Sequence, residues 1–501
     1  MGHPLLYEIN TRCWLPELSA KYDRVVSLAD VPDDEFVAWQ RRGFTHIWLM
    51  GVWTSGPRSR AQALSHPDLQ RAYSEVLPGW KPEDVGGSPY AIAYYEVPPA
   101  LGGDAGLAEF REKLRGYGLR LILDFVPNHL GLDHPWVRQR PSLFVQSPGQ
   151  GPDTFRQETD AGVRWLAHGK DPYFPGWTDT VQLDYRLPAT RAAMFGLLQT
   201  IAARCDGVRC DMAMLVLADI FERTWQWLPA AGPATPAEFW PDAISRIKSK
   251  RPDFLFLAEA YWGLEPVLQS QGFDYTYDKT LYDRLLERKP AEVHHHLLGL
   301  LPQTVCAGAH FLENHDEPRI APILSAQEHR AAALLILGLP GMAFLHDGQL
   351  TGARLKIPVQ LARRPVEPPQ PEIQKLYQEL LQVLQEAAWR QGTCKLVRPV
   401  AAWPDNPTAI NFVILSWQRQ PPGFYVVVVN LAPHPSQCFA PLAVDGLAAH
   451  QWAMTGLLSD ESYVRPGVNL QTRGLYLDLP AHGAQVFQFT PVETDGSPAD
   501  F

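Results

Sequence analysis

The sequence lacks the hallmarks of several classes of protein. Its 44 Lys and Arg are outnumbered by 54 Asp and Glu, which gives a net charge of −10. This balance argues against a nucleic-acid partner, because binding to phosphates needs clustered cations. No apolar run is long enough to span a membrane, and the first ten residues show neither the basic nor the apolar region of a secretion signal.

Cysteine is scarce, and the spacing of the cysteines argues against disulfide bonds and zinc sites. The six cysteines show no CxxC motif, so we predict free thiols in a reducing compartment and neither a disulfide framework nor a zinc site. We therefore expect a cytoplasmic protein without a membrane or nucleic-acid partner. The sequence says nothing of its oligomeric state.

Alternating strand-like and helix-like segments are what the chain does contain. With 501 residues, 46% hydrophobic and 20% charged, it is long enough for a large globular domain and at least one more. Strand candidates that alternate with helical patterns predict parallel βα units, and their number is that of a closed (β/α)8 TIM barrel. These candidates are residues 5–9, 46–49, 120–125, 207–210, 254–258, 272–275, 309–312 and 342–345.

Two stretches interrupt this rhythm and predict further domains. Residues 130–188 are loop-like and aromatic, so we expect a short inserted subdomain after the third barrel strand. The barrel then comprises residues 1–129 and 189–390. β-rich segments split by Pro and Gly predict a C-terminal antiparallel β-sandwich over residues 391–492, followed by a tail, 493–501.

Four strand-like runs end in a functional carboxylate or histidine. Residues 124–129 read D-x-x-x-N-H, residues 207–211 read G-x-R-x-D, residues 254–259 end in Glu259, and residues 314–316 read N-H-D. In a (β/α)8 barrel the active site lies at the C-terminal ends of the strands. Each motif alone is weak evidence, but four in one order predict a shared site.

The order and content of these motifs resemble the α-amylase family of glycoside hydrolases. The resemblance covers most of the chain and implies that Asp211 is the nucleophile, Glu259 the general acid/base, and Asp316 the residue that stabilises the transition state. The residue types suit retaining cleavage, which needs one ionised and one protonated carboxyl group. Arg209 should lie on the same side of an extended strand as Asp211 and favour its charge. The apolar neighbours of Glu259 should raise its pKa.

The resemblance also implies supporting residues. His129 and His315 match histidines that bond the sugar, Tyr90 matches a tyrosine that stacks on it, and Asp124 would brace Arg209. Trp262, in a loop beyond Glu259, is a candidate aromatic platform for sugar. The resemblance also implies that Arg209 lies in the substrate-binding site. It implies that Asn128, often a calcium ligand in the family, lies just behind that site.

Two departures from the family pattern bear on metal binding and on the subsite for the leaving group, where an acceptor would also bind. Met214 and Leu215 replace a Lys-His pair that many members carry after the nucleophile. The histidine often lends its carbonyl to calcium, so we predict no metal and no cofactor, and in particular no tightly held calcium. The same replacement predicts a more apolar acceptor subsite. Three consecutive histidines, 294–296, cannot converge on one ion from a helix, and we expect them on a solvated face.

The sequence thus predicts a retaining α-glycosidase that hydrolyses α-1,4-linked glucan or malto-oligosaccharides. An alternative is a transglycosidase or isomerase of the same family acting on α-glucosides. A more distant alternative is a non-catalytic carbohydrate-binding protein, although all three carboxylates are present. Hydrolysis and transfer differ only in the acceptor, and the residues leave that choice open.

Overall fold

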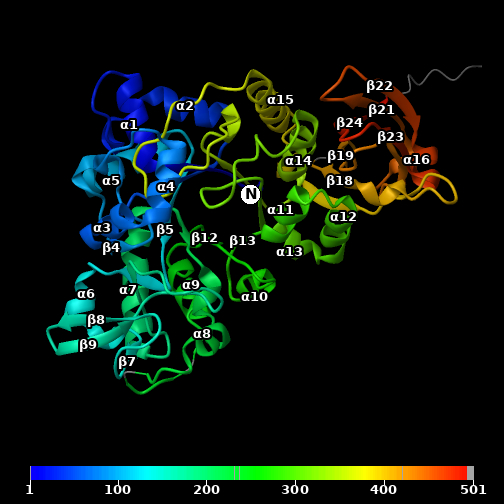
Figure 1. Cartoon of the computed structure of the whole chain (residues 1–501). Helices are drawn as coiled ribbons and strands as arrows, with labels where there is room; N and C mark the ends of the chain where they lie inside the picture. The colour runs from blue at the N-terminus through cyan, green and yellow to red at the C-terminus, as the bar shows by residue number, and fades with distance from the viewer. Residues whose placement is uncertain (1, 231, 236, 420, 493–501) are drawn as a thin grey trace, which may run out of the picture.

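Eight parallel strands form a closed barrel, in the order β1-β15-β14-β13-β12-β11-β5-β2 (Figure 1). The computed structural model describes residues 2–492 except 231, 236 and 420, so the predicted tail 493–501 lies outside the described residues. The barrel strands are β1 (Leu5–Asn10), β2 (His46–Met50), β5 (Arg120–Phe125), β11 (Gly207–Cys210), β12 (Leu255–Ala258), β13 (Tyr275–Tyr277), β14 (Gly308–Phe311) and β15 (Met342–His346).

The predicted barrel is therefore confirmed, with one strand displaced. The sixth strand was expected at residues 272–275 but begins at Tyr275. Gly272 has φ +109°, a backbone conformation that suits glycine and not a strand, and it closes the turn after α10 (Glu265–Ser270).

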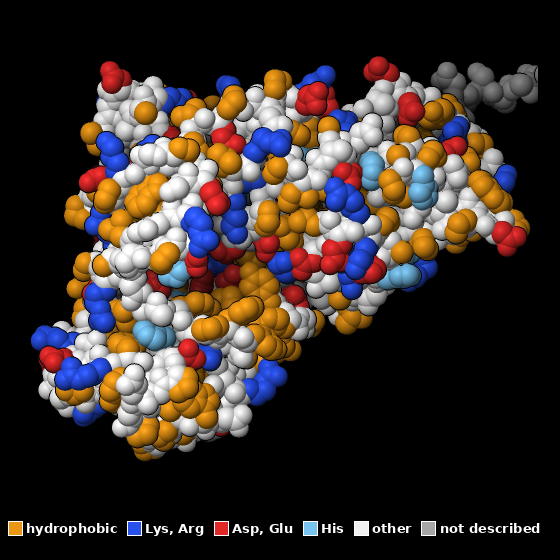
Figure 2. All heavy atoms as spheres, viewed as in Figure 1, with side chains coloured by type: hydrophobic (Ala, Val, Ile, Leu, Met, Phe, Trp, Pro, Cys, Tyr) orange, Lys and Arg blue, Asp and Glu red, His pale blue; other side chains and the backbone are white. Residues whose placement is uncertain are grey.

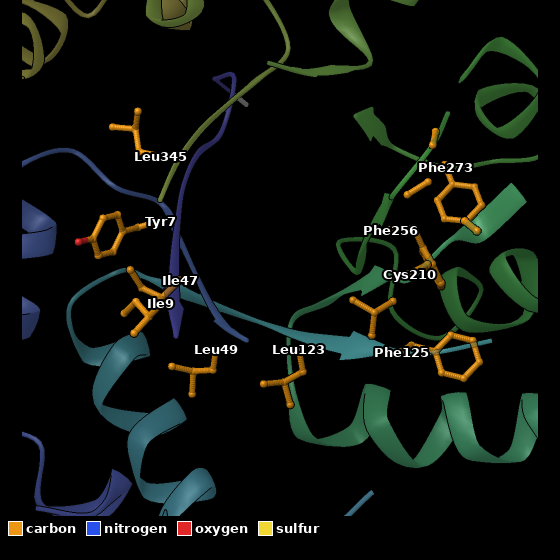
Figure 3. Close-up of a cluster of buried hydrophobic side chains, with 14 of the residues drawn as sticks. Tyr7, Ile9, Ile47, Leu49, Leu123, Phe125, Cys210, Phe256, Phe273 and Leu345 are labelled. Carbon is orange, nitrogen blue, oxygen red and sulfur yellow. The ribbon is translucent and has the colours of Figure 1, made fainter. Parts of the chain in front are cut away.

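Alternation along the barrel strands decides which side chains face the barrel interior. In β1, Tyr7 and Ile9 point outward and pack with Leu49 and Leu123 against the surrounding helices (Figure 3). The inner side holds a second buried cluster to which Leu6 belongs. Because side chains of a strand alternate, Glu8 follows Leu6 to the inner side. Both faces of these strands are buried, which explains their nearly continuous apolar sequence.

Helices cover the outside of the barrel. α15 buries a stripe of side chains from Ile373 to Leu384, and α5 buries Leu107 and Phe110 and ends before Gly118. The helices that follow the barrel strands are α1 (Thr11–Lys21), α2 (Asp33–Arg41), α3 (Pro57–Ser65), α4 (Pro67–Val76), α5 (Gly103–Gly116), α7 (Pro188–Arg204), α8 (Ala218–Trp225), α9 (Trp240–Lys248), α10, α11 (Lys279–Leu286), α12 (Pro290–Gly299), α13 (Pro302–Cys306), α14 (Ala326–Gly338) and α15 (Pro371–Ala387).

The inserted segment after β5 carries two small antiparallel sheets. One pairs β6 (His129–Gly131) with β10 (Thr180–Gln182). The other has the order β7-β9-β8, formed by Gln146–Ser147, Gly162–Ala167 and Thr154–Thr159. α6 (Pro135–Gln139) lies between β6 and β7 in the chain, and α6, β7, β8 and β9 form a lobe at the lower left of Figure 1.

The C-terminal region is an antiparallel sandwich of a six-stranded and a three-stranded sheet. The larger sheet packs on α14, where Trp417 donates its Nε1–H to the carbonyl of Gly338 at 2.8 Å. Its strands are β16 (Thr393–Val397), β18 (Phe412–Gln418), β19 (Phe424–Asn430), β24 (Ala484–Val492), β21 (Gln451–Gly456) and β22 (Ser462–Pro466); the smaller sheet has β17 (Val400–Ala401), β20 (Ser436–Ala440) and β23 (Leu475–Leu479). The fold class expected from the sequence is thus confirmed. The domain limits given above stay a prediction.

Two further expectations concern the cysteines and the membrane. All six cysteines are free thiols, as predicted. Across the part of the chain that the structure describes, no helix combines the length and the apolar character needed to cross a membrane.

One buried arginine ties the end of the barrel to the start of the sandwich. Arg390 donates to the carbonyls of Leu337 at 2.8 Å, Leu339 at 2.6 Å and Gly341 at 2.7 Å, all near the junction of α14 and β15. A further bond at 3.3 Å reaches Pro4, just before β1. Arg390 therefore satisfies carbonyls that water cannot reach.

Replacing this arginine should destabilise the whole protein. Arg390→Met keeps much of the side-chain length but leaves several buried carbonyls without a donor, so we expect unfolding to become easier by about 3 kcal/mol or more. Urea unfolding followed by circular dichroism measures this. Arg419→Met, at an exposed position, is the control and should change stability by less than about 0.5 kcal/mol. Equal effects of the two substitutions would contradict the bonding role.

Candidate active site

A completely buried arginine stands at the centre of the predicted carboxylates. Nη1 of Arg209 lies 2.7 Å from Oδ1 of Asp211, and Nη2 lies 2.9 Å from Oε2 of Glu259. Oδ1 of Asp124 is 3.8 Å from Nη1, and Oδ2 of Asp316 is 4.0 Å from Nη2. The structure thus brings the three predicted catalytic residues and Asp124 around one guanidinium.

Strand register explains this convergence. β11 is paired with β5 and β12 so that Arg209 lies beside Asp124 on one side and Leu257 on the other. Cys210 is paired with Ala258, and the next residues along the two strands are Asp211 and Glu259. Parallel strands in register therefore deliver both carboxylates at the same level, at the C-terminal end of the barrel.

The Glu259 carboxyl group is held by donors on both oxygens. Oε2 accepts from the backbone N–H of Met212 at 2.6 Å, and Oε1 accepts from the hydroxyl of Tyr261 at 2.8 Å. Burial raises the pKa of Glu259 to about 7, against the opposing influence of Arg209. Burial also raises the pKa of Asp124 to about 7. Glu259 is thus able to carry a proton near neutral pH, as its apolar neighbours predicted.

Asp316 faces solvent more than the other carboxylates, with 43% of its side chain exposed. Nε2 of His315 lies 2.9 Å from its Oδ2 and 2.7 Å from the hydroxyl of Tyr90. Burial opposes its ionisation, but the charge and hydrogen bond of His315 and the charge of Arg209 outweigh burial and lower the pKa of Asp316. An ionised, accessible carboxylate can meet a ligand from the cleft.

The other predicted residues lie at different depths. Tyr90 stacks on the His315 ring at 5.4 Å and also lies 5.3 Å from the Arg209 guanidinium. His129 is buried, its ring 5.2 Å from that of Trp177, and burial lowers its pKa while Asp211 opposes that shift. Trp262, by contrast, lies on the rim.

The rim is formed in part by an exposed aromatic pair. Trp262 is 41% exposed and Tyr173 is 63% exposed, and their rings meet edge to face at 5.0 Å. Trp262 has φ +64°, an unfavourable conformation for a bulky side chain. Tyr173 belongs to the inserted segment and Trp262 to the loop after β12. Figure 2 shows a hollow with acidic side chains in its depth and hydrophobic ones around it, where Figure 1 places the lower lobe against the barrel.

Three residues near these groups were missed from the sequence. Tyr261 bonds Glu259, Glu8 contacts His315, and Gln182 bonds Asn128. Glu8 had a signal in the sequence, because a charge inside the apolar run 5–9 is unusual on a fully buried strand. The other two carried none.

Two expectations about side-chain exposure were wrong. Met214 and Leu215 are buried in the main hydrophobic core, so they present no apolar surface to an acceptor sugar. Of the three consecutive histidines, His295 is exposed as expected, but His294 and His296 do not lie on a solvated face. His294 is buried with Nδ1 3.0 Å from the carbonyl of Phe412, and His296 is 2.9 Å from Asp278. The sandwich and the barrel cover this side of α12, which helical spacing alone does not reveal.

Comparison with known proteins identifies the family. The family model for the catalytic domain of alpha amylase matches residues 40–360. The chain belongs to the α-amylase family. Among curated relatives, this family member is 27% identical to the alpha-amylase MalA of Haloarcula japonica over 269 residues, 52% of this chain and 36% of that protein. It is also 27% identical over 241 residues to an alpha-1,4-glucan:maltose-1-phosphate maltosyltransferase of Cereibacter sphaeroides, covering 45% of this chain and 34% of the relative.

Solved structures of the same family share the fold over nearly the whole chain. The maltogenic alpha-amylase AmyB of Thermotoga neapolitana superposes with a TM-score of 0.67 at 18% identity, covering 98% of this chain and 99% of that one. The curated relatives are matched over much less of their length, about a third for the two named above.

The junction between barrel and insertion does not suit the calcium ion that the family resemblance implies. The carbonyl and Oδ1 of Asn128 both accept from Nε2 of Gln182, at 2.9 Å and 3.0 Å, and the carbonyl of Leu183 lies 3.1 Å from the same nitrogen. An amide N–H group therefore lies where these oxygens converge, and calcium needs 6–8 oxygen ligands. Within the described residues, no group of three or more His, Cys, Asp or Glu is arranged to hold a metal.

This arrangement predicts how the junction responds to cations. Wild-type protein should unfold at the same temperature in EDTA and in calcium, because Gln182 already occupies the oxygen cluster. Gln182→Glu replaces the donor with a carboxylate, so it should be less stable in EDTA and should recover when calcium is added. Differential scanning calorimetry measures both. A wild-type melting temperature that drops in EDTA and returns with calcium would contradict the interpretation.

Proposed function

We propose that this member of the α-amylase family is a retaining α-glycosidase that hydrolyses α-1,4-linked glucan or malto-oligosaccharides. The observation that carries the proposal is the bridge formed by Arg209 between Asp211 and Glu259, at 2.7 Å and 2.9 Å. Carboxyl groups bridged by one guanidinium are close together. Retaining enzymes need such closeness, whereas inverting enzymes leave space for a water between their carboxyl groups.

In the proposed first step, Asp211 attacks the anomeric carbon while Glu259 gives its proton to the glycosidic oxygen. The bond between that oxygen and the sugar breaks, the leaving sugar departs with a hydroxyl, and a glycosyl ester with Asp211 remains. In the second step Glu259 takes a proton from water, the water oxygen attacks the same carbon, and Asp211 is released. Each step conserves atoms and charge, and the configuration is inverted twice.

The surroundings support these roles. The ion pair with Arg209 suits a nucleophile that must be charged, and the raised pKa of Glu259 suits a group that must hold a proton. The half-exposed carboxylate of Asp316 is available to sugar hydroxyls, and Tyr90 and His129 would border the same sugar. We propose further that the domain limits predicted above are those of the protein. A cytoplasmic location is also proposed, in keeping with the six free thiols.

A second candidate function is transfer to a sugar acceptor in place of water. The exposed pair of Trp262 and Tyr173, beside the loop that follows Glu259, supports it because aromatic faces pack on the C–H side of a sugar. One of the relatives named above is a maltosyltransferase. An acceptor held on this rim would compete with water for the glycosyl ester.

Glu259→Gln is the first test of the hydrolase proposal. The amide cannot donate a proton, so kcat on maltotriose should fall by about 10²–10⁴-fold. Activity on aryl glycosides with good leaving groups should fall less, since their departure needs no proton. Wild-type kcat/KM should decline as pH rises through about 7, where Glu259 loses its proton, and this decline should be absent in the variant.

Glu265→Gln provides the matched control, because Glu265 begins α10 directly after the loop that follows Glu259 but makes no ion pair with Arg209 among the described residues. It should keep wild-type kcat and the wild-type pH profile. Near-normal activity of Glu259→Gln on maltotriose would overturn the assignment.

Trp262→Ala tests the transfer candidate. If the rim binds an acceptor by stacking, longer oligosaccharides should form early from concentrated maltotriose with wild-type enzyme, and the variant should shift the products toward shorter sugars. Chromatography of early products measures the ratio. If wild-type enzyme forms only shorter sugars, hydrolysis stands and transfer is excluded.

A further inference from the structure

A glutamate on the first barrel strand lies inside the barrel with no solvent exposure. Glu8 occupies β1, and its neighbours Tyr7 and Ile9 point outward into the helix layer. Leu6 and Trp48 belong to the buried apolar cluster inside the barrel, and Trp48, paired with Glu8 across the strands, donates to the buried Asp124. A buried carboxylate is costly unless it is paired, so its partner indicates why it is there.

The partner of Glu8 is His315, 307 residues away in the sequence. Oε1 of Glu8 lies 2.5 Å from Nδ1 of His315. Its other oxygen, Oε2, is buried without a hydrogen-bond partner among the described residues. The imidazole is therefore the one hydrogen-bond partner of the Glu8 carboxylate among the described residues.

The opposite nitrogen of His315 also faces oxygen atoms. Nε2 lies 2.9 Å from Oδ2 of Asp316 and 2.7 Å from the hydroxyl of Tyr90. A carboxylate can only accept, so a proton on each ring nitrogen satisfies both Glu8 and Asp316. A neutral imidazole could donate to one of them and would leave the other facing a lone pair.

We propose that Glu8 is a positioning residue that keeps His315 doubly protonated and directs its Nε2–H at Asp316 and at a hydroxyl of the bound sugar. This inference deepens the proposed glycosidase function and rests on it for its catalytic consequence. Glu8 acts only through His315. Without the second charge, His315 would hold one proton and could point its lone pair at Asp316.

The charged groups around His315 agree with this assignment. Glu8 faces it from β1, Asp124 from β5, and Tyr90 and Asp316 from loops above the strands, while Arg209 is near the same carboxylates. Burial alone would lower the pKa of His315. Asp316 and Glu8 outweigh it and raise the pKa well above its ordinary value, so the imidazolium should persist through neutral pH and be lost only as pH rises further.

Nuclear magnetic resonance of protein labelled with ¹⁵N at histidine tests the charge directly and needs no activity. In wild-type protein, His315 should show two protonated nitrogens at neutral pH, assigned by the signal that disappears in His315→Gln. In Glu8→Gln, which keeps the acceptor but removes its charge, His315 should lose a proton at a pH lower by about one unit or more. A neutral His315 in wild-type protein at pH 7 would overturn the proposal, whether or not the variant folds.

Kinetics on maltotriose test whether Glu8 acts through His315. Glu8→Gln should lower kcat/KM about 10- to 100-fold. In the His315→Gln background the same change should have almost no further effect, because the group it orients is gone. If the role of Glu8 were merely structural, Glu8→Gln would lower kcat/KM by the same factor in the wild-type and in the His315→Gln background. That result would overturn the proposal.

Asp278→Asn is the matched control. Asp278 is also a buried carboxylate, directly after β13, 3.1 Å from Nδ1 of His310 and 2.9 Å from Nε2 of His296, and it makes no ion pair with Arg209 among the described residues. It should lower the melting temperature without moving the His315 titration. Absence of cleavage by wild-type enzyme on any α-glucan would reject the proposed function, whereas the His315 titration would still decide the role of Glu8.

Discussion

Arg209 carries a full positive charge with no exposure to water, and the site is arranged around that constraint. Two carboxylates meet its guanidinium directly, two more stand within 4.0 Å, and the rings of Trp48, Tyr90 and Tyr277 lie 5.3–5.7 Å from its central carbon. A buried cation needs this surrounding of charge and aromatic faces. Because these carboxylates all contact or approach the one guanidinium, their positions relative to one another are fixed.

The carboxylates around this arginine differ because their environments differ. Glu259 and Asp124 are deeply buried, and burial raises the pKa of each. Asp316 is half-exposed and lies beside a histidine, which lowers its pKa. Groups around one cation therefore differ in charge, with Glu259 able to hold a proton near neutral pH and Asp316 held ionised. Nε2 of His315 lies 2.9 Å from Asp316, and the charges of Asp316 and Glu8 raise the pKa of His315.

The inserted segment and the barrel are joined by neutral groups as well as by packing. Gln182, on β10, donates its side-chain N–H groups to the oxygens of Asn128. β10 also pairs with β6, which begins at His129, so this neutral amide helps to hold His129 in place. Tyr173 of the inserted segment and Trp262 of the loop after β12 meet edge to face, so the two parts are also in aromatic contact.

Much of the fold and the centre of the site could be predicted because the signals are local. Buried parallel strands read as short apolar runs, and the carboxylate that follows each run falls at the same end of the barrel. That reasoning placed Asp211, Glu259 and Asp316 together from single segments, and Gly272 alone shifted one strand. What the tertiary structure decided are contacts between distant segments: Glu8 with His315, Gln182 with Asn128, and the burial of Met214. Side-chain alternation tells which face a residue occupies, but a partner hundreds of residues away is chosen only when strand register and loop packing bring the two together.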